Sequence, residues 1–222
     1  MRGVGSVPGV ARGTLITIEG LDGAGKSTLA DALLAELSAR VPRAVLLREP
    51  GGVELSERIR TLVKDPGLSV APRAEALLYA AARAQLCAER LQPLLADGAL
   101  VLLDRFVDSS LAYQGAARAL GVEHVRAINA FATGAIAADR TLLLRIDPAA
   151  GRARQRERAE PADRLEREGE HFFAAIAAAY DDIARAEPAR VRVIDAAQPP
   201  AAVLADALAA LADLLPAADG AN

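Results

Sequence analysis

A glycine-rich stretch near the amino terminus, IEGLDGAGKST at 18–28, has the spacing of a loop that binds phosphates. The pattern G-x-x-x-x-G-K-[ST] is met by Gly20, Gly25, Lys26 and Ser27. An apolar run precedes the loop and a helical pattern follows it, which is the context that this motif requires. Its glycines let the backbone N–H groups turn toward phosphate oxygens, and the following helix adds a positive partial charge. A glycine-rich turn with an incidental lysine is the structural alternative.

Lys26 is one of only two lysines among 26 basic residues. An ammonium group is a compact point charge and a guanidinium is a planar fork, so this choice favours a cradle around nucleotide phosphates. The hydroxyl of Ser27 is a candidate Mg²⁺ ligand beside them. Contacts to ATP are predicted for Gly20, Leu21, Asp22, Gly23, Ala24, Gly25, Lys26, Ser27 and Thr28.

A phosphate loop alone does not distinguish an ATPase, a GTPase and a kinase. A GTPase requires an N/T-K-x-D guanine motif, and the second lysine, Lys64, stands in TLVKDPG at 61–67. That stretch follows an amphipathic helical pattern instead of a strand and lacks the required order. The sequence therefore argues against a GTPase.

Two further motifs follow apolar runs. Asp104 ends the run at 99–104 and Arg105 follows it, where an Asp can reach Mg²⁺ or its waters and an Arg can hold a phosphate with two hydrogen bonds. An ion pair at a strand end is the alternative. REPGG at 48–52 turns sharply after its own run and places Arg48 for a phosphate, unless Arg48 simply points outward from a structural turn.

Tyr79 and Arg83 stand four residues apart in a helical pattern and share one face. A ring that stacks on a flat base and an Arg that donates to a carbonyl would make a pyrimidine pocket, although core packing also explains Tyr79. Hydroxyl and amide groups for the edge of the base are offered by Ser109, Ser110 and Gln114.

The densest charge run lies at 152–168 and contains Arg152, Arg154, Arg156 and Arg158. On a helix, each step of two residues rotates by about 200°, so alternate members of this series face opposite sides. A mobile Arg can stabilise charge on a transferred phosphoryl group. An exposed charged helix is the alternative.

The elements that would position these residues form an alternating series. Apolar runs that predict buried parallel strands lie at 14–19, 43–48, 99–104, 140–146 and 190–195. Helical patterns lie at 26–40, 54–64, 72–97, 121–133, 148–158, 166–186 and 199–214. We expect an α/β fold of three layers, in which a five-stranded parallel sheet has helices on both faces and ligands bind at the carboxyl ends of the strands.

Composition narrows the classes of function. The net charge of −3 and the pI near 5.5 argue against nucleic-acid binding through a broad basic surface. Cys87 is the only cysteine and there are two histidines, so neither an intrachain disulfide nor a structural zinc site is expected. We find no signal peptide and no membrane span, and expect a cytoplasmic protein. The organisation that we predict is a flexible tail at 1–12, one domain at 13–215 with a small lid near 148–166, and a flexible tail at 216–222.

Taken together, these motifs resemble bacterial thymidylate kinases, members of the P-loop nucleoside monophosphate kinase family, over about 14–200. The resemblance is carried by IEGLDGAGKST (18–28), REPGG (48–52), LLYAAARAQL (77–86), LLDRFVDSSLAYQG (102–115), DRLE (163–166) and VIDA (193–196). It implies a P-loop kinase fold that phosphorylates dTMP to dTDP with ATP–Mg²⁺ in dTTP biosynthesis, and a homodimer.

The resemblance also implies roles for individual residues. Arg105 would bind the acceptor phosphate, Tyr79 and Arg83 the thymine, and Asp22 the 3′-hydroxyl of the sugar near the metal. The implied contacts to dTMP are Asp22, Arg48, Pro50, Tyr79, Arg83, Arg105, Ser109, Ser110, Tyr113 and Gln114, and the metal set is Asp22, Ser27 and Asp104. Because the loop carries no Arg, the catalytic charge should come from the lid, first from Arg154 and second from Arg158, beside Asp22, Lys26 and Arg105.

Two rival functions are weighed against this one. A P-loop kinase for another nucleoside monophosphate or for a deoxynucleoside would differ in its preferred acceptor. An ATP-gated partitioning or assembly protein would hydrolyse ATP without an acceptor, and it leaves REPGG, the Asp104–Arg105 motif and the lid unexplained.

Overall fold

The computed structural model describes residues 12–157 and 161–215. The predicted tail at 216–222 and residues 1–11 of the other predicted tail lie outside the described residues. Arg12 is described, and its Nη2 donates to the carbonyl of Ala137 at 3.0 Å.

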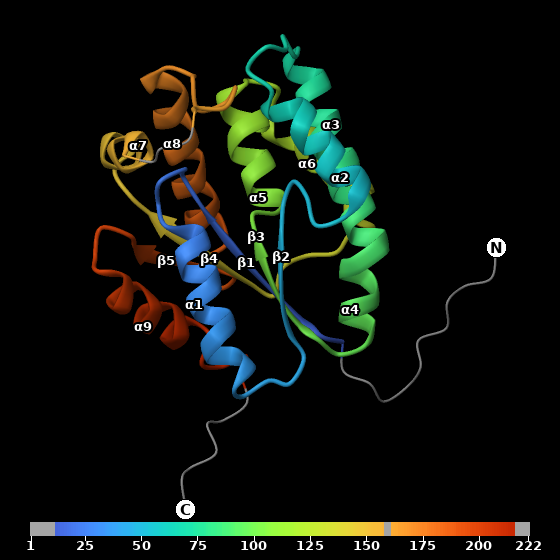
Figure 1. Cartoon of the computed structure of the whole chain (residues 1–222), viewed down its shortest axis with the longest axis vertical. Helices are drawn as coiled ribbons and strands as arrows, with labels where there is room; N and C mark the ends of the chain where they lie inside the picture. Colours follow the sequence, from blue (N-terminus) through green and yellow to red (C-terminus); the bar gives the residue numbers. More distant parts are fainter. Residues whose placement is uncertain (1–11, 158–160, 216–222) are drawn as a thin grey trace, which may run out of the picture.

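A parallel sheet of five strands lies at the centre of the fold (Figure 1). Its strands are β1 (Thr14–Gly20), β2 (Ala44–Arg48), β3 (Leu100–Asp104), β4 (Arg140–Arg145) and β5 (Val191–Asp195). They are ordered β2-β3-β1-β4-β5, so β1 is central. The five predicted strands are confirmed, each with bounds within one residue of those expected.

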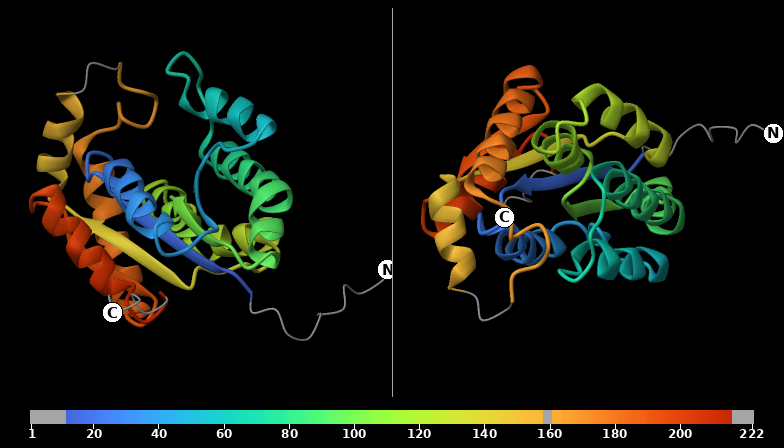
Figure 2. Two further views of the ribbon diagram at one scale, coloured as in Figure 1. Left: turned by 60° about the horizontal axis from the view of Figure 1, so that its bottom comes forward. Right: turned by 90° about the horizontal axis from the view of Figure 1, so that it is seen from above.

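Helices cover both faces of this sheet (Figure 2). On one face, α1 (Lys26–Ser38) packs on β1, β2 and β3, and α9 (Pro200–Ala210) packs on β5 and on α1. The other face is covered by α3 (Pro72–Leu86), η1 (Cys87–Leu91), α4 (Gln92–Ala96), α5 (Val107–Ser110), η2 (Leu111–Ala117), α6 (Val122–Thr133) and α8 (Glu170–Ala186). α2 (Glu54–Lys64) packs against α3, and α7 (Pro148–Arg156) packs against α8. The expected three-layer fold is confirmed.

The alternation of side chains along β1 explains the two layers of core. Ile16 and Ile18 are fully buried in a cluster that contains Leu33 of α1. Leu15 precedes Ile16 and points to the opposite face of the strand, where it is fully buried in a second cluster with Leu91 of η1. A strand that is apolar on both faces fits only between two layers of helices.

The predicted helices differ from the structure in several places. The helix expected at 72–97 contains the π-helical turn η1, because Pro93 has no N–H and its ring crowds the preceding turn. The helix expected at 166–186 begins only at Glu170, because the carboxylate of Asp163 accepts from the amides of Leu165 and Glu166 and forms a separate turn. The helical turns α5 and η2 were not predicted, because their residues were interpreted as a binding motif in the sequence analysis.

The helix expected at 199–214 ends at Ala210, four residues early. Beyond it, Leu211 and Ala212 donate to the carbonyls three residues before them, at 3.2 and 3.3 Å. This tighter bonding closes the helix.

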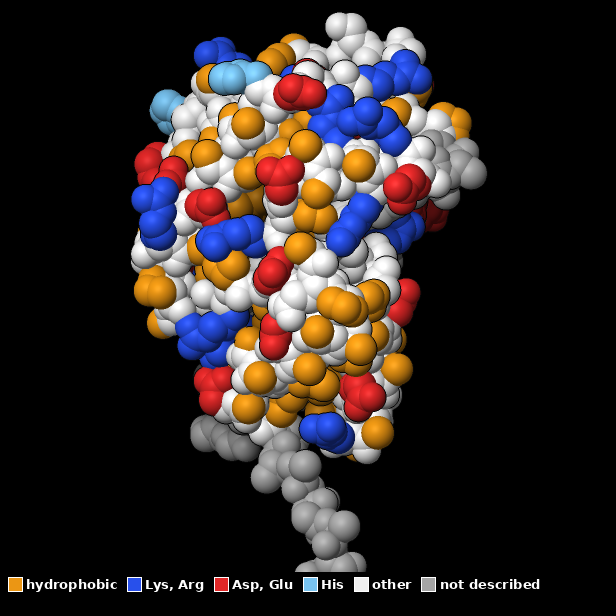
Figure 3. All heavy atoms as spheres, turned by 90° about the vertical axis from the view of Figure 1, so that its left-hand side faces the viewer, with side chains coloured by type: hydrophobic (Ala, Val, Ile, Leu, Met, Phe, Trp, Pro, Cys, Tyr) orange, Lys and Arg blue, Asp and Glu red, His pale blue; other side chains and the backbone are white. Residues whose placement is uncertain are grey.

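The surface at the left of Figure 1 mixes positive, negative and apolar side chains (Figure 3). Among the described residues, no helix combines the length and the apolar character that a membrane span requires.

Candidate active site

The phosphate loop joins β1 to α1 in the predicted strand–loop–helix context. Gly23 and Gly25 have φ angles of 82° and 91°, values that residues with a side chain rarely adopt. A Cβ on Gly23 would lie 2.1 Å from the carbonyl oxygen of Gly151 in α7, so the loop packs directly against the predicted lid. The loop conformation therefore depends on glycine at both of these positions.

Lys26 is the first residue of α1 and is only 7% exposed. Its Nζ donates to the carbonyl of Leu21 at 2.8 Å and lies 3.8 Å from Oδ1 of Asp22. Burial and the neighbouring charge of Arg105 lower the pKa of Lys26 to about 8, and nearby carboxylates only partly oppose this. The loop thus holds an ammonium group whose charge an anionic ligand would stabilise.

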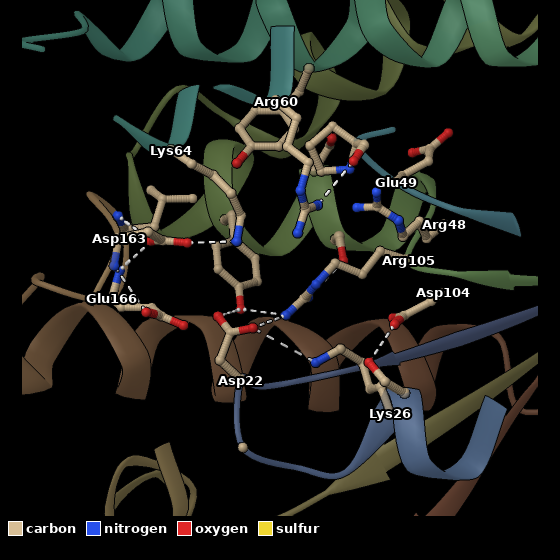
Figure 4. Close-up of a pocket in the computed structure, with 18 of the residues that line it drawn as sticks. Asp22, Lys26, Arg48, Glu49, Arg60, Lys64, Asp104, Arg105, Asp163 and Glu166 are labelled. Carbon is tan, nitrogen blue, oxygen red and sulfur yellow. Dashed lines mark hydrogen bonds and ion pairs between the residues drawn. The ribbon is translucent and has the colours of Figure 1, made fainter. Parts of the chain in front are cut away.

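Asp22 and Arg105 form an ion pair beside Lys26 (Figure 4). Arg105 has a φ of 69°, and its guanidinium also donates to the carbonyl of Gly20 at 3.1 Å. The hydroxyl of Tyr113 donates to the other oxygen of Asp22 at 3.1 Å. Burial opposes ionisation of Asp22, but Arg105 and Lys26 outweigh it and hold the pKa of Asp22 below its usual range.

The residues expected to hold Mg²⁺ lie next to this group. Ser27 Oγ donates to Oδ2 of Asp104 at 3.1 Å, and Oδ1 of Asp104 is buried without a hydrogen-bond partner. Oxygen donors suit Mg²⁺, which usually takes one or two carboxylates and completes its shell with phosphates and water. Within 12–157 and 161–215, no cluster of three or more His, Cys, Asp and Glu side chains could hold a metal. The residues present therefore fit a metal that binds together with a nucleotide.

All of the predicted dTMP contacts line one cavity of about 280 Å³, into which the phosphate loop also opens. They come from the loop, from β2 and the turn after it, from α3, from the end of β3 and from α5 and η2. Parallel strands end at one edge of the sheet, and the register pairs Asp104 with both Ile18 and Arg48. Arg48 itself donates to Glu57 at 2.7 Å.

Arg83 is 2% exposed, and all of its N–H groups are engaged. Nε donates to Glu49 at 2.7 Å, Nη1 to Ser110 and Asn129, and Nη2 to the carbonyl of Phe106. Nη2 also lies within ion-pair distance of Glu49. Burial raises the pKa of Glu49 to about 7, although Arg83 opposes this shift. Arg83 lies in the wall of the cavity, but a direct bond to a base would require one of its present partners to be exchanged.

Sequence reasoning missed two cations of this cavity, Arg60 and Lys64 on α2. Arg60 Nη1 donates to the carbonyl of Pro50 at 2.9 Å, and Lys64 Nζ lies 2.8 Å from Oδ2 of Asp163. Both side chains reach into the cavity from the wall opposite Asp22 and Lys26 (Figure 4). Their spacing of four on one face of the helix predicted at 54–64 is a signal that could have found them.

Glu19 was also missed by the sequence analysis. It is fully buried at the end of β1, where its carboxylate accepts from the amide of Phe106 at 2.7 Å, Ser109 Oγ at 2.6 Å and Tyr180 Oη at 2.9 Å. Burial and the nearby charge of Asp108 raise the pKa of Glu19. The network fixes the turn that carries Arg105, because Ser109 Oγ also accepts from Arg105 at 3.0 Å.

The lid arginines do not all approach the same place. Arg154 donates to the carbonyl of Ala196 at 2.9 Å and lines a separate cavity of about 290 Å³ with Gly25 and Thr28 of the phosphate loop. Arg152 lies over the ring of Phe173, 5.2 Å from its centroid. Arg158 lies outside the described residues.

The fold and this cavity define a class: P-loop kinases that act on a small phosphorylated acceptor. Comparison with known proteins then narrows the class. A model of the thymidylate kinase family matches residues 18–207. A thymidylate kinase of Lactobacillus delbrueckii subsp. bulgaricus is 45% identical over 190 residues, which are 84% of this chain and 90% of that protein. One from Deinococcus radiodurans is 43% identical over 204 residues, 92% of this chain and 98% of that protein.

A solved structure extends the likeness to the fold. The thymidylate kinase of Ehrlichia chaffeensis superposes with a TM-score of 0.75 at 26% identity, covering 90% of this chain and 99% of that chain. The chain belongs to the thymidylate kinase family, whose activity is the phosphorylation of dTMP to dTDP with ATP. The resemblance predicted from the motifs is thereby confirmed.

Proposed function

We propose that this chain transfers the γ-phosphoryl group of ATP to the phosphate of dTMP, with both substrates bound at the carboxyl edge of the sheet. The observation that carries the proposal is the shared cavity: Lys26 and Ser27 line the same 280 Å³ space as Arg48, Arg105 and Tyr79. Two phosphorylated ligands held there would lie end to end. Positioning of this kind supplies much of the catalysis in phosphoryl transfer.

On the donor side, the backbone of the loop from Gly20 to Thr28 would hold the phosphates, and Lys26 would contact the β- and γ-phosphates. We assign the nucleoside part of ATP to the cavity of about 290 Å³, whose lining includes Leu29, Ala32 and Val203. Arg154 lines the same cavity, which supports contact of this lid residue with the donor. The lid is proposed to comprise about 148–166.

For Mg²⁺, Ser27 and Asp104 would be the protein ligands, with Asp22 close by. The unpartnered Oδ1 of Asp104 supports this assignment, because a buried carboxylate oxygen without a donor is costly. When bound, the ion would neutralise part of the phosphate charge.

On the acceptor side, Arg105 and Arg48 would hold the phosphate of dTMP, and the ring of Tyr79 would stack on thymine. Asp22 would contact the 3′-hydroxyl of the sugar. No strong general base is needed, because the attacking phosphate oxygen is already anionic near neutral pH. Lid arginines, Arg154 first and Arg158 second, would stabilise the transferred group and exclude water.

We also propose that the chain forms a homodimer through α3 and α6. Its proposed location is the cytoplasm, which contains both ATP and nucleoside monophosphates. Phe131 of α6 is 92% exposed and Leu77 of α3 is 57% exposed, and the two helices pack side by side. Exposed large apolar side chains on neighbouring helices are typical of an interface.

A coupled assay of ADP release tests the proposed reaction. The purified chain is supplied with ATP–Mg²⁺ and with dTMP, dUMP, dCMP or thymidine in turn, and with no acceptor as the control. We expect the highest kcat/KM with dTMP and no phosphorylation of thymidine. Without an acceptor, little ADP should be released. Equal ADP release with and without acceptors would favour an ATP-hydrolysing protein instead.

A further inference from the structure

A buried carboxylate on α3, Glu75, has no role in the proposed reaction. It is 0% exposed and receives side chains from two other segments. Oε1 accepts from Nε2 of Gln114 at 2.9 Å and Nε of Arg118 at 3.3 Å, and Oε2 accepts from Nη2 of Arg118 at 3.2 Å. Oε2 also lies 2.7 Å from Nη2 of Arg164, a contact that is an ion pair by distance but lacks hydrogen-bond geometry. Two guanidinium groups thus offset the cost of burying this charge.

The carboxylate decides which way the amide of Gln114 points. The N and O atoms of a Gln amide are nearly indistinguishable by shape, so their placement follows from their partners. A carboxylate paired with arginines only accepts hydrogen bonds, so the NH₂ group of Gln114 must face Glu75. Gln114 lines the acceptor cavity, and no described residue donates to its amide oxygen. That oxygen is therefore available as an acceptor.

Ser110 has the complementary polarity. Its Oγ accepts from Nη1 of Arg83 at 2.8 Å, which leaves the hydroxyl proton free to donate. Ser110 also lines the cavity. The wall thus offers one acceptor and one donor to the edge of a base.

We propose that Glu75 is a positioning residue that sets the base specificity of the acceptor site. By holding the amide oxygen of Gln114 toward the cavity, it favours a pyrimidine that donates at N3, namely thymine or uracil. Cytosine accepts at N3 and donates from its 4-amino group, so it would place acceptor against acceptor and donor against donor. The inference rests on the proposed function, because it requires a pyrimidine in this cavity.

The test is Glu75→Gln, which keeps the shape but lets position 75 accept or donate. The amide of Gln114 can then turn over and present NH₂ to the base. We expect the ratio of the dissociation constants of dCMP and dTMP, measured by competition, to fall about tenfold, the effect of one mispaired hydrogen bond. A role limited to stability would weaken both ligands by the same factor and leave the ratio unchanged, which would overturn the inference.

Arg164→Gln is the matched control. This variant breaks the ion pair between Arg164 and Glu75 but leaves the Glu75 carboxylate and its bond to Gln114 in place. The ratio of the dissociation constants of dCMP and dTMP should therefore stay at the wild-type value. An equal shift of the ratio in both variants would also overturn the inference. Turnover of dTMP by the unaltered chain tests the proposed function separately, so failure of one is distinguishable from failure of the other.

A measurement on the unaltered chain covers the case in which Glu75→Gln does not fold. The side-chain amide protons of Gln114, assigned by NMR, should shift little when dTMP is added, because they face Glu75. A large downfield shift of one of them would mean that nitrogen faces the base and would refute the proposed orientation.

Discussion

The phosphate loop and the wall opposite it hold charge in different ways. The loop presents one ammonium group, Lys26, from a short segment that its backbone shapes. The opposite wall collects cations from several elements, and three of them already have an acidic partner: Arg48 with Glu57, Arg83 with Glu49, and Lys64 with Asp163. Lys26 Nζ lies 3.8 Å from the Asp22 carboxylate, whereas these wall cations lie 2.5 to 2.8 Å from their acidic partners. A ligand at the wall must therefore replace closer ion pairs than a ligand at the loop. A substitution in the loop should therefore cost more than one in the wall.

The largest effect is expected for Lys26→Ala, with Lys64→Ala as the matched control on the opposite wall. Loss of the only ammonium group in the loop should lower kcat by about 1,000-fold or more, while the melting temperature stays close to that of the unaltered chain. Lys64→Ala should lower kcat/KM far less, because Asp163 already neutralises its charge. Equal losses in steady-state assays of the two variants would remove the distinction between loop and wall.

Arg105 belongs to both regions, because it pairs with Asp22 of the loop and lines the cavity proposed for the acceptor. Arg105→Ala should reduce kcat/KM for dTMP by several hundred-fold, since it removes a phosphate contact and leaves the Asp22 carboxylate without its partner. The KM for ATP should change much less. A larger effect on ATP than on dTMP would assign Arg105 to the donor side.

Arg154→Ala tests the lid. If this residue acts on the transferred group, kcat should fall about 100-fold while the dissociation constant of dTMP stays nearly constant. An unchanged kcat would move the catalytic role to another lid arginine.

The lowered pKa of Lys26 predicts a pH dependence. In the free protein the ammonium group loses its proton as the pH rises through about 8, instead of through its usual 10.5. The kcat/KM for ATP should then fall about tenfold per pH unit above 8, because it reports the free protein, whereas bound phosphates keep Lys26 charged and kcat nearly level. A profile of kcat/KM that stays level to pH 9.5 would contradict this.

The smallest effect on chemistry is expected for Phe131, an exposed residue of α6 that does not line the cavity. Phe131→Glu should convert the proposed dimer to a monomer in analytical ultracentrifugation, and kcat should change only a few-fold. A single species of unchanged mass would place the interface elsewhere.

The two regions also differ in how far the sequence could predict them. The loop was predictable because its ligands are backbone groups of one continuous segment, with Asp104 reached through neighbouring strands. Most residues of the proposed acceptor site were predicted from short motifs. Arg60 and Lys64 were missed because their place in the cavity depends on how α2 packs over it. The bond between Glu75 and Gln114 joins residues 39 apart in the chain, and no local pattern records it.

The most direct test of the central claim, that loop and acceptor wall form one site, follows the transferred group itself. The chain is incubated with ATP labelled at the γ-phosphate, Mg²⁺ and dTMP, and the labelled products are separated. The account predicts that the label appears in dTDP, at the terminal phosphate, with little free phosphate. Label found mainly in inorganic phosphate, at a rate that dTMP does not change, would contradict it.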